Sequence, residues 1–182
     1  SGIVRPFSAE AFVHSIRREI EVCQAVGAER LVINSGARSE RYLKELYPNL
    51  PPQAFVQYGN YIGDTIRMAN EIGVKEITLG VMLGKAVKLA EGKLDTHSRK
   101  SVMNRDFLFA QATDCGCSHN TLQAISHITL ARELWSLLPS SEADAFYPHL
   151  LALCHKHVDP LLPQGKILIV LIDENGCIRY HL

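Results

Sequence analysis

Short apolar runs and stretches of helical periodicity alternate along the chain between residues 30 and 91. Three of the runs have the length of buried strands and lie at residues 30–34, 55–58 and 76–82. Segments in which apolar residues recur every three or four positions follow at residues 39–46, 61–72 and 86–91. Three successive strand–helix units predict a parallel sheet with right-handed crossovers. The expected fold class is therefore α/β, with an open, mostly parallel sheet and flanking helices.

A further helix is expected before the first strand. Ser8 is a favourable N-cap for a helix over residues 9–26, and Gly27 marks its end. Ser39 is the expected cap of the helix that follows the first strand.

The second half of the chain has a different texture. Helices are predicted at residues 106–113, 121–138 and 142–158. The middle helix carries an apolar stripe of Leu122, Ile125, Leu130, Leu134 and Leu137. The apolar run 167–172 and the following Asn175-Gly176 predict a core strand that turns into an antiparallel edge strand. Residues 1–182 are interpreted as one α/β domain that carries a helical insertion and a C-terminal antiparallel hairpin.

Composition excludes several classes of protein. The 182 residues include 47% hydrophobic side chains, enough for the core of one compact domain. The 19 Lys and Arg balance 19 Asp and Glu, whereas nucleic-acid and membrane-surface binders usually carry a basic excess. No apolar run approaches the roughly 18 to 20 residues that cross a bilayer. Five cysteines, an odd number, indicate reduced thiols in the cytoplasm.

A small, polar loop is expected after each predicted strand, at Asn34-Ser35-Gly36, Gly59-Asn60 and Leu83-Gly84-Lys85. Ligands of open parallel sheets bind outside the carboxyl ends of the strands, where helix N-termini favour anions. These loops are candidates for an anion site, and ordinary connecting glycines are the alternative explanation. The glycine patterns of NAD-dependent oxidoreductases and P-loop ATPases are both absent, which argues against those two classes.

Basic residues gather near the predicted strand ends and in the loop after them. Their charge-assisted contacts suit a ligand rich in carboxylates or phosphates, and a solvated surface is the alternative. We single out Arg38, Lys85 and Arg99 from a group that also contains Arg41, Lys88, Lys100 and Arg105.

Other candidate side chains have equally open roles. His97, between Thr96 and Ser98, could shuttle a proton or bind a ligand oxygen, although an isolated histidine often does neither. Glu40 and Asp64 lie in the first turns of predicted helices, where the helix dipole alone favours a carboxylate. They could equally hold a ribose hydroxyl.

Two groups of cysteines and histidines offer potential metal ligands: Cys115-x-Cys117-x-His119 and Cys154-His155-x-His157. The paired cysteines are too close for a zinc ribbon or finger. Helix positions two apart also point in different directions. No metal site is expected.

Three strings resemble the cobalamin-biosynthesis D family, the cobalt-precorrin-5B C(1)-methyltransferases of the anaerobic corrin pathway. They are the opening SGIVRP, then GDTIRMANEIG and LGKAVKLAEGKLDTHSR. The resemblance covers nearly the whole chain and is strongest from Gly59 to Arg99. In the family the opening string runs GTSGIVRP and follows a separate N-terminal domain. The resemblance therefore implies the C-terminal domain of a longer protein.

The family transfers a methyl group from S-adenosylmethionine to carbon 1 of cobalt-precorrin-5B, and cobalt is present only within the substrate macrocycle. The implied partners are this small molecule, the chain's own N-terminal domain and a second copy in a homodimer, with neither nucleic acid nor membrane. Methyl transfer from a sulfonium needs positioning and exclusion of water rather than covalent catalysis. The alternative function is a non-catalytic module that binds the tetrapyrrole or dimerises while the missing domain carries the cofactor.

Positions that match the family, together with the basic residues, define the expected site. The cofactor-binding residues are Gly36, Ser39, Glu40, Asn60, Gly63, Asp64 and Gly84. The substrate-binding residues are Arg38, Lys85, Lys88, Thr96, Ser98 and Arg99, and His97 is the catalytic candidate. The family often has a histidine shortly before its Gly-Lys pair, where this chain has Val81-Met82-Leu83. The role of that histidine is not carried over.

Overall fold

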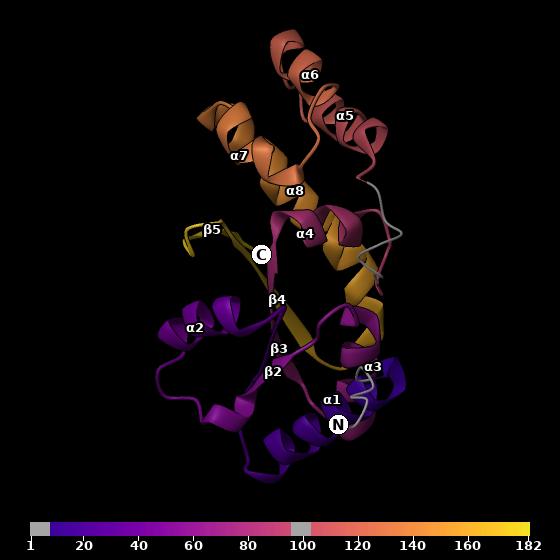
Figure 1. Cartoon of the computed structure of the whole chain (residues 1–182), viewed down its shortest axis with the longest axis vertical. Helices are drawn as coiled ribbons and strands as arrows, with labels where there is room; N and C mark the ends of the chain where they lie inside the picture. The colour runs from indigo at the N-terminus through magenta and orange to yellow at the C-terminus, as the bar shows by residue number, and fades with distance from the viewer. Residues whose placement is uncertain (1–7, 96–102) are drawn as a thin grey trace, which may run out of the picture.

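A computed structural model describes residues 8–95 and 103–182, and one five-stranded sheet organises them (Figure 1). The strands lie in the order β2-β1-β3-β4-β5. The first four pair in parallel and β5 pairs antiparallel with β4, which confirms the predicted fold class. The strands are β1 (Leu31–Asn34), β2 (Phe55–Gln57), β3 (Glu76–Met82), β4 (Lys166–Ile172) and β5 (Ile178–His181).

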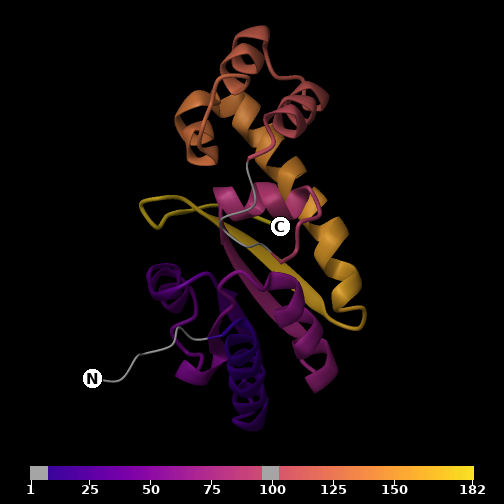
Figure 2. The ribbon, with the colours of Figure 1, turned by 45° about the vertical axis from the view of Figure 1, so that its right-hand side comes forward.

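Helices cover both faces of the sheet. The connections β1–β2 and β2–β3 run in opposite directions across the sheet, so right-handed crossovers place their helices on opposite faces. One face carries α2, while on the other α1 packs against α3 and α4 packs against α8 (Figure 2). These helices are α1 (Ala9–Ala25), α2 (Ala37–Leu46), α3 (Ile62–Ile72), α4 (Leu83–Ala90) and α8 (Ser140–Val158).

The hydrophobic core follows the sheet. All four residues of β1 are buried, as are five of the seven in β3, because helices cover both faces. The α1 helix turns Ile16, Ile20 and Cys23 inward, and its expected N-cap is confirmed because Ser8 Oγ accepts a hydrogen bond from the Ala11 N–H at 3.1 Å. Within the described residues, no helix has both the length and the apolar character that a membrane span requires.

Two predicted helix boundaries are wrong. The expected cap Ser39 lies inside α2, which begins at Ala37, and its buried hydroxyl bonds to Ser35 Oγ at 2.8 Å instead. The expected loop over residues 83–85 does not form, because α4 begins at Leu83, directly after β3. Leu83 is fully buried, so burial of this side chain draws the chain into the helix without an intervening loop.

The helical insertion between β3 and β4 is confirmed, but its middle helix is broken. In place of one helix over 121–138, the structure has α6 and α7 with a short 3₁₀ helix, η2, before α7. The Glu133 carboxylate accepts hydrogen bonds from the N–H groups of Thr129 and Leu130, which starts a new helix where the stripe predicted continuity. The elements are α5 (Arg105–Asp114), α6 (His119–Ile125), η2 (Ala131–Glu133) and α7 (Leu134–Leu137).

The break divides the predicted apolar stripe. Ile125 and Leu134 are fully buried, whereas Leu130 remains 49% exposed. In Figure 1 the insertion lies beyond the end of the sheet at which β3 passes into α4. The remaining short helices, η1 (Pro52–Ala54) and η3 (Asp159–Leu161), lead into β2 and follow α8.

The C-terminal hairpin forms as predicted. Gly176 has a φ of 85° and its N–H donates to the Asp173 carbonyl at 3.0 Å, which closes the turn between β4 and β5. The ring of Tyr42 from α2 lies against Gly176 where any Cβ would fall. The hairpin is thereby tied to the α2 face of the sheet.

Candidate functional site

The carboxyl ends of the parallel strands meet at one edge of the sheet, as the sequence predicts. The strand order reverses direction between β1 and β3, which is where ligands bind in open α/β sheets. Short contacts join the strand ends there, since the Tyr58 N–H donates to the Asn34 carbonyl at 2.8 Å. The Lys85 ammonium, from the first turn of α4, donates to the Gly59 carbonyl after β2. Residues from three separate strand–helix units thus converge.

Lys85 is a strongly perturbed titratable group at this edge. Its Nζ lies 4.9 Å from the centre of the buried Tyr58 ring. Burial, and then the nearby charge of Lys88, lower the pKa of Lys85 to about 8. The Tyr58 hydroxyl donates to the Gly80 carbonyl at 2.8 Å, and burial raises its pKa well above the usual range. Lys85 is among the residues predicted from the sequence, whereas Tyr58 is not, and its aromatic ring directly after a strand is the one signal for it.

The start of α2 is open to a ligand. Gly36 is its N-cap, no side chain of the described residues caps it, and an added Cβ would meet no described atom within 4 Å. Asn34 is fully buried, and its Oδ1 accepts the Gly36 N–H at 3.1 Å. The first turn of α2 therefore presents N–H groups and the helix dipole to open space, which suits an anion.

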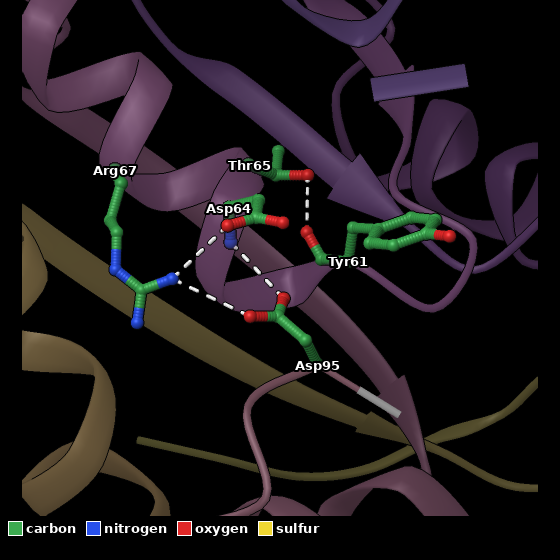
Figure 3. A network of polar contacts seen from close by, with 5 residues as sticks. All are labelled: Tyr61, Asp64, Thr65, Arg67 and Asp95. Carbon is green, nitrogen blue, oxygen red and sulfur yellow. Dashed lines mark hydrogen bonds and ion pairs between the residues drawn. The ribbon is translucent and has the colours of Figure 1, made fainter. Parts of the chain in front are cut away.

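The start of α3 is closed by the chain itself (Figure 3). The Gly63 N–H donates to the Leu94 carbonyl at 3.2 Å, and the Asp64 N–H donates to the Asp95 carboxylate at 3.2 Å. Arg67 pairs with Asp64 at 3.2 Å and with Asp95 at 3.4 Å. The predicted cofactor-binding residues Gly63 and Asp64 are thus engaged by the segment that follows α4. Asn60 lies in the turn just before this helix.

The remaining predicted residues of α2 point elsewhere. The Arg38 guanidinium donates to the Glu174 carbonyl in the hairpin and to the Tyr42 hydroxyl at 3.5 Å. Glu40 pairs with Lys44 at 3.6 Å and lines a hollow of about 240 Å³ beside Gln57 of β2. Both residues lie in the first turn of α2, where their side chains already have these partners.

The start of α4 is the second open helix end. An added Cβ at Gly84 would meet no described atom within 4 Å, and no described side chain caps the helix. Lys85 and Lys88 lie one turn apart, and no carboxylate among the described residues forms an ion pair with either. Gly84 and Lys88 border a hollow of about 340 Å³ between α4 and the helical insertion.

Some predicted residues lie outside the described part of the chain. They are Thr96, His97, Ser98 and Arg99, and their assignments remain predictions. A larger hollow, of about 570 Å³, lies at the opposite edge of the sheet and contains none of the predicted residues. Among residues 8–95 and 103–182, no three His, Cys, Asp or Glu side chains form a metal-ligating group.

Asp173, at the carboxyl end of β4, is a polar residue that the sequence analysis did not select. It is 6% exposed and accepts the N–H groups of Asn175 and Cys177, each at 2.9 Å. Burial alone would raise the pKa of Asp173, but these bonds and one from Arg179 hold it below its ordinary value. All its described partners belong to the hairpin, so its role here is to shape the turn.

Comparison with known proteins gives a consistent set of relatives. A family model described as "CbiD, C-terminal domain" matches residues 95–181. The cobalt-precorrin-5B C(1)-methyltransferase of Prosthecochloris aestuarii is 37% identical over 180 residues, which make up 98% of this chain and 49% of that protein. No solved structure gives a significant match.

Proteins of the same name from other organisms are also similar. The Priestia megaterium protein is 34% identical over 84% of this chain and 42% of its own length. The Thermus thermophilus protein is 28% identical over 98% of this chain and 50% of its own length. The chain spans about half the length of the curated relatives it matches.

Proposed function

The chain belongs to the cobalt-precorrin-5B C(1)-methyltransferase family, and we propose on this premise that it is the C-terminal part of such an enzyme. The complete protein would transfer a methyl group from S-adenosylmethionine to carbon 1 of cobalt-precorrin-5B in the cytoplasm. The chain corresponds to about half of the relatives, so its own N-terminal domain is the proposed partner within the same enzyme. A homodimer remains a prediction.

The observation that carries this proposal is the convergence at the carboxyl edge of the sheet. Two helix starts, at Gly36 and Gly84, face open space on either side of the point where the strand order reverses. Between these two helix starts, the hydrogen bond from Lys85 to the Gly59 carbonyl joins α4 to the loop between β2 and α3. Anionic groups of a donor and of an acceptor could therefore be held at neighbouring positions of one edge.

The residues at the α2 start fit the carboxylate of S-adenosylmethionine. Gly36 leaves room for a ligand, and Ser35 and Ser39 place hydroxyl groups 2.8 Å apart beside it. We assign the cofactor carboxylate to this helix start and retain Gly84 as the second candidate. Gly63 and Asp64 are less suitable, because Leu94 and Asp95 already occupy the N–H groups of the α3 start.

Methyl transfer requires little from the protein beyond positioning of the methyl donor and the acceptor. When bound, the cofactor supplies an electrophilic methyl group, and the reaction is an in-line displacement. Lys85 and Lys88 would orient the acceptor through its carboxylates, and the packed edge of the sheet would limit access of water. In this proposal Arg38, Thr96, Ser98 and Arg99 remain candidate substrate contacts and His97 a candidate catalytic group.

Isothermal titration of the full-length protein with S-adenosylhomocysteine tests the proposal. We expect saturable binding, and we expect Gly36→Asp to weaken it by about tenfold or more, because the new carboxylate occupies the anion position. Asn49→Asp is the matched control, since it adds the same charge at an exposed position of the opposite edge. Absence of binding at millimolar ligand would contradict the proposed function, whereas equal affinities of Gly36→Asp and wild type would contradict only the placement.

A crystal structure of the full-length protein with the cofactor separates the alternative function. If the full-length protein binds the cofactor and a crystal structure shows it against the N-terminal domain alone, this chain is the non-catalytic module that holds the tetrapyrrole or dimerises.

A further inference from the structure

A hollow of about 340 Å³ separates α4 from the helical insertion. One wall consists of residues of α4, and the other consists of residues just before α5 and around η2. Its volume lies at the lower end of the range of small-molecule sites, roughly 300 to 1,000 Å³. The lining residues are Gly84, Val87, Lys88, Glu91, Met103, Asn104, Thr129, Leu130 and Ala131.

The insertion side of this hollow presents an apolar surface that is held in place. Leu130 is 49% exposed, although it belongs to a stripe whose neighbours Ile125 and Leu134 are fully buried. The Glu133 carboxylate fixes the backbone at Leu130 by accepting its N–H at 2.7 Å and that of Thr129 at 2.8 Å. A large apolar side chain is thereby kept at the rim of the hollow rather than folded into the core.

The α4 side presents positive charge that no carboxylate of the described residues neutralises in an ion pair. Glu91 is the acidic residue of the hollow, but Lys93 pairs with its carboxylate at 3.2 Å and the Asn104 side chain donates to it at 2.6 Å. Among the described residues Lys88 therefore has no ion-pair partner, and Lys85 lies one turn earlier on the same helix. Like charges at this spacing repel, and an anion held near both would relieve the repulsion.

We propose that the helical insertion and α4 together bind the edge of a polycarboxylated macrocycle, with an apolar rim against Leu130, Met103 and Val87 and a carboxylate at Lys88. This inference rests on the proposed function, which supplies the class of ligand. The hollow admits an edge rather than a whole tetrapyrrole, so it serves as one wall of the acceptor site. The insertion, whose α8 packs on α4, thereby also contributes to substrate recognition.

Uroporphyrin I, an octacarboxylated tetrapyrrole, is a suitable probe for the full-length protein, and its binding is followed by fluorescence quenching. We expect Leu130→Asp to weaken binding by about tenfold or more, because it removes apolar contact and repels the carboxylates. Leu46→Asp is the matched control, since Leu46 is 42% exposed at the opposite edge of the sheet. Binding as tight in Leu130→Asp as in Leu46→Asp would overturn the inference.

The charge requirement is tested separately. We expect Lys88→Gln to weaken binding of uroporphyrin by about threefold at low ionic strength and by less at high salt. Lys156→Gln, at an exposed position of α8, should leave the affinity unchanged. Mellitate, a benzene hexacarboxylate, carries the negative charge without the macrocycle. If mellitate displaces bound uroporphyrin with an affinity equal to that of uroporphyrin itself, the apolar part of the inference is overturned.

Titration of the same variants with S-adenosylhomocysteine distinguishes failure of this inference from failure of the proposed function. We expect Leu130→Asp to bind it as wild type does. If wild type binds both uroporphyrin and S-adenosylhomocysteine, and Leu130→Asp keeps both affinities, only the assignment of this hollow to the acceptor site is wrong. If wild type binds neither ligand, the proposed function itself fails and this inference fails with it.

Discussion

The starts of α3 and α4 lie at the same edge of the sheet and share a glycine in their first turn, yet they are in opposite states. At α3 the N–H groups of Gly63 and Asp64 are satisfied by the chain itself, through Leu94 and Asp95. At α4 no described atom lies within 4 Å of the position that a Cβ on Gly84 would take. The two starts also differ in charge balance, since Arg67 faces two carboxylates whereas Lys85 and Lys88 face none among the described residues.

This difference distinguishes glycines that leave room for a ligand from glycines that another segment of the chain contacts. A glycine near the carboxyl end of a strand has two explanations, close approach of another segment or room for a ligand. Gly63 belongs to the first class, because an added Cβ would lie 2.9 Å from Leu94 Cβ. Gly84 belongs to the second.

The largest effect expected from this contrast is on stability. Gly63→Ala should lower the free energy of unfolding by about 1 to 3 kcal/mol, because Leu94 must move to admit the methyl group. Gly84→Ala should leave stability unchanged or raise it by up to about 1 kcal/mol, because its Cβ meets no described atom and alanine favours a helix. Urea denaturation of both variants measures this, and equal losses would remove the distinction between the two helix starts.

The pH dependence of stability tests the unbalanced charge of Lys85 at the start of α4. Its folded pKa of about 8 lies below the ordinary 10.5, so between these values the unfolded state binds more protons. The free energy of unfolding should therefore rise with pH through this window. With a discount for partial exposure, the rise is about 1 to 2 kcal/mol. Below about pH 8 both states are protonated and the contribution is constant.

Urea denaturation of wild type and Lys85→Met between about pH 7.5 and about pH 10 measures the effect as a difference in slope. The variant also loses the hydrogen bond to Gly59. The pH-independent contribution of this bond shifts the whole curve and does not change its slope. Lys156→Met should follow wild type. Parallel curves for wild type and Lys85→Met would show that the Lys85 amine keeps its ordinary pKa.

Asp95 tests the closed state of the α3 start. Asp95→Ala removes the acceptor of the Asp64 N–H and should lower the free energy of unfolding by about 1 kcal/mol, as loss of a helix cap does. Asp95→Asn keeps an acceptor and loses only the exposed ion pair to Arg67, so its cost should be about 0.5 kcal/mol or less. Equal stability of Asp95→Ala and wild type, by thermal or urea denaturation, would show that Asp95 does not act as a cap.

The smallest expected effects on the free energy of unfolding come from two charge substitutions, and they should have opposite signs. Arg67→Gln loses two exposed ion pairs and should destabilise the protein by about 0.5 kcal/mol, and added salt should reduce this cost. Lys88→Gln relieves repulsion with Lys85 and should stabilise it by about 0.2 to 0.5 kcal/mol. Denaturation at low and high ionic strength compares them, and the same sign for both would contradict the difference in charge balance.

Much of the site could be predicted because strand order determines which loops share an edge. The loops after β1 and β2 were located from apolar runs and small polar residues, and Lys85 was selected from its place after β3. The closure of α3 could not be predicted, because it depends on Asp95, which lies far along the chain from Gly63. The contact of Arg38 with Glu174 could not be predicted either, since Glu174 belongs to the last hairpin, and the role of Arg38 stays a prediction.

The sequence by itself determined the strand–helix alternation, the final Asn175-Gly176 turn and the polar character of the strand ends, because these are local properties of period and turn chemistry. Only the tertiary structure decided which helix starts are open, where the predicted helix over 121–138 breaks, and why Leu130 stays at the surface. The open helix starts depend on contacts between segments distant in the chain, which no local pattern encodes. The break at Glu133 is a local cap, but it competes with the apolar stripe, and the folded structure shows which of the two local signals prevails.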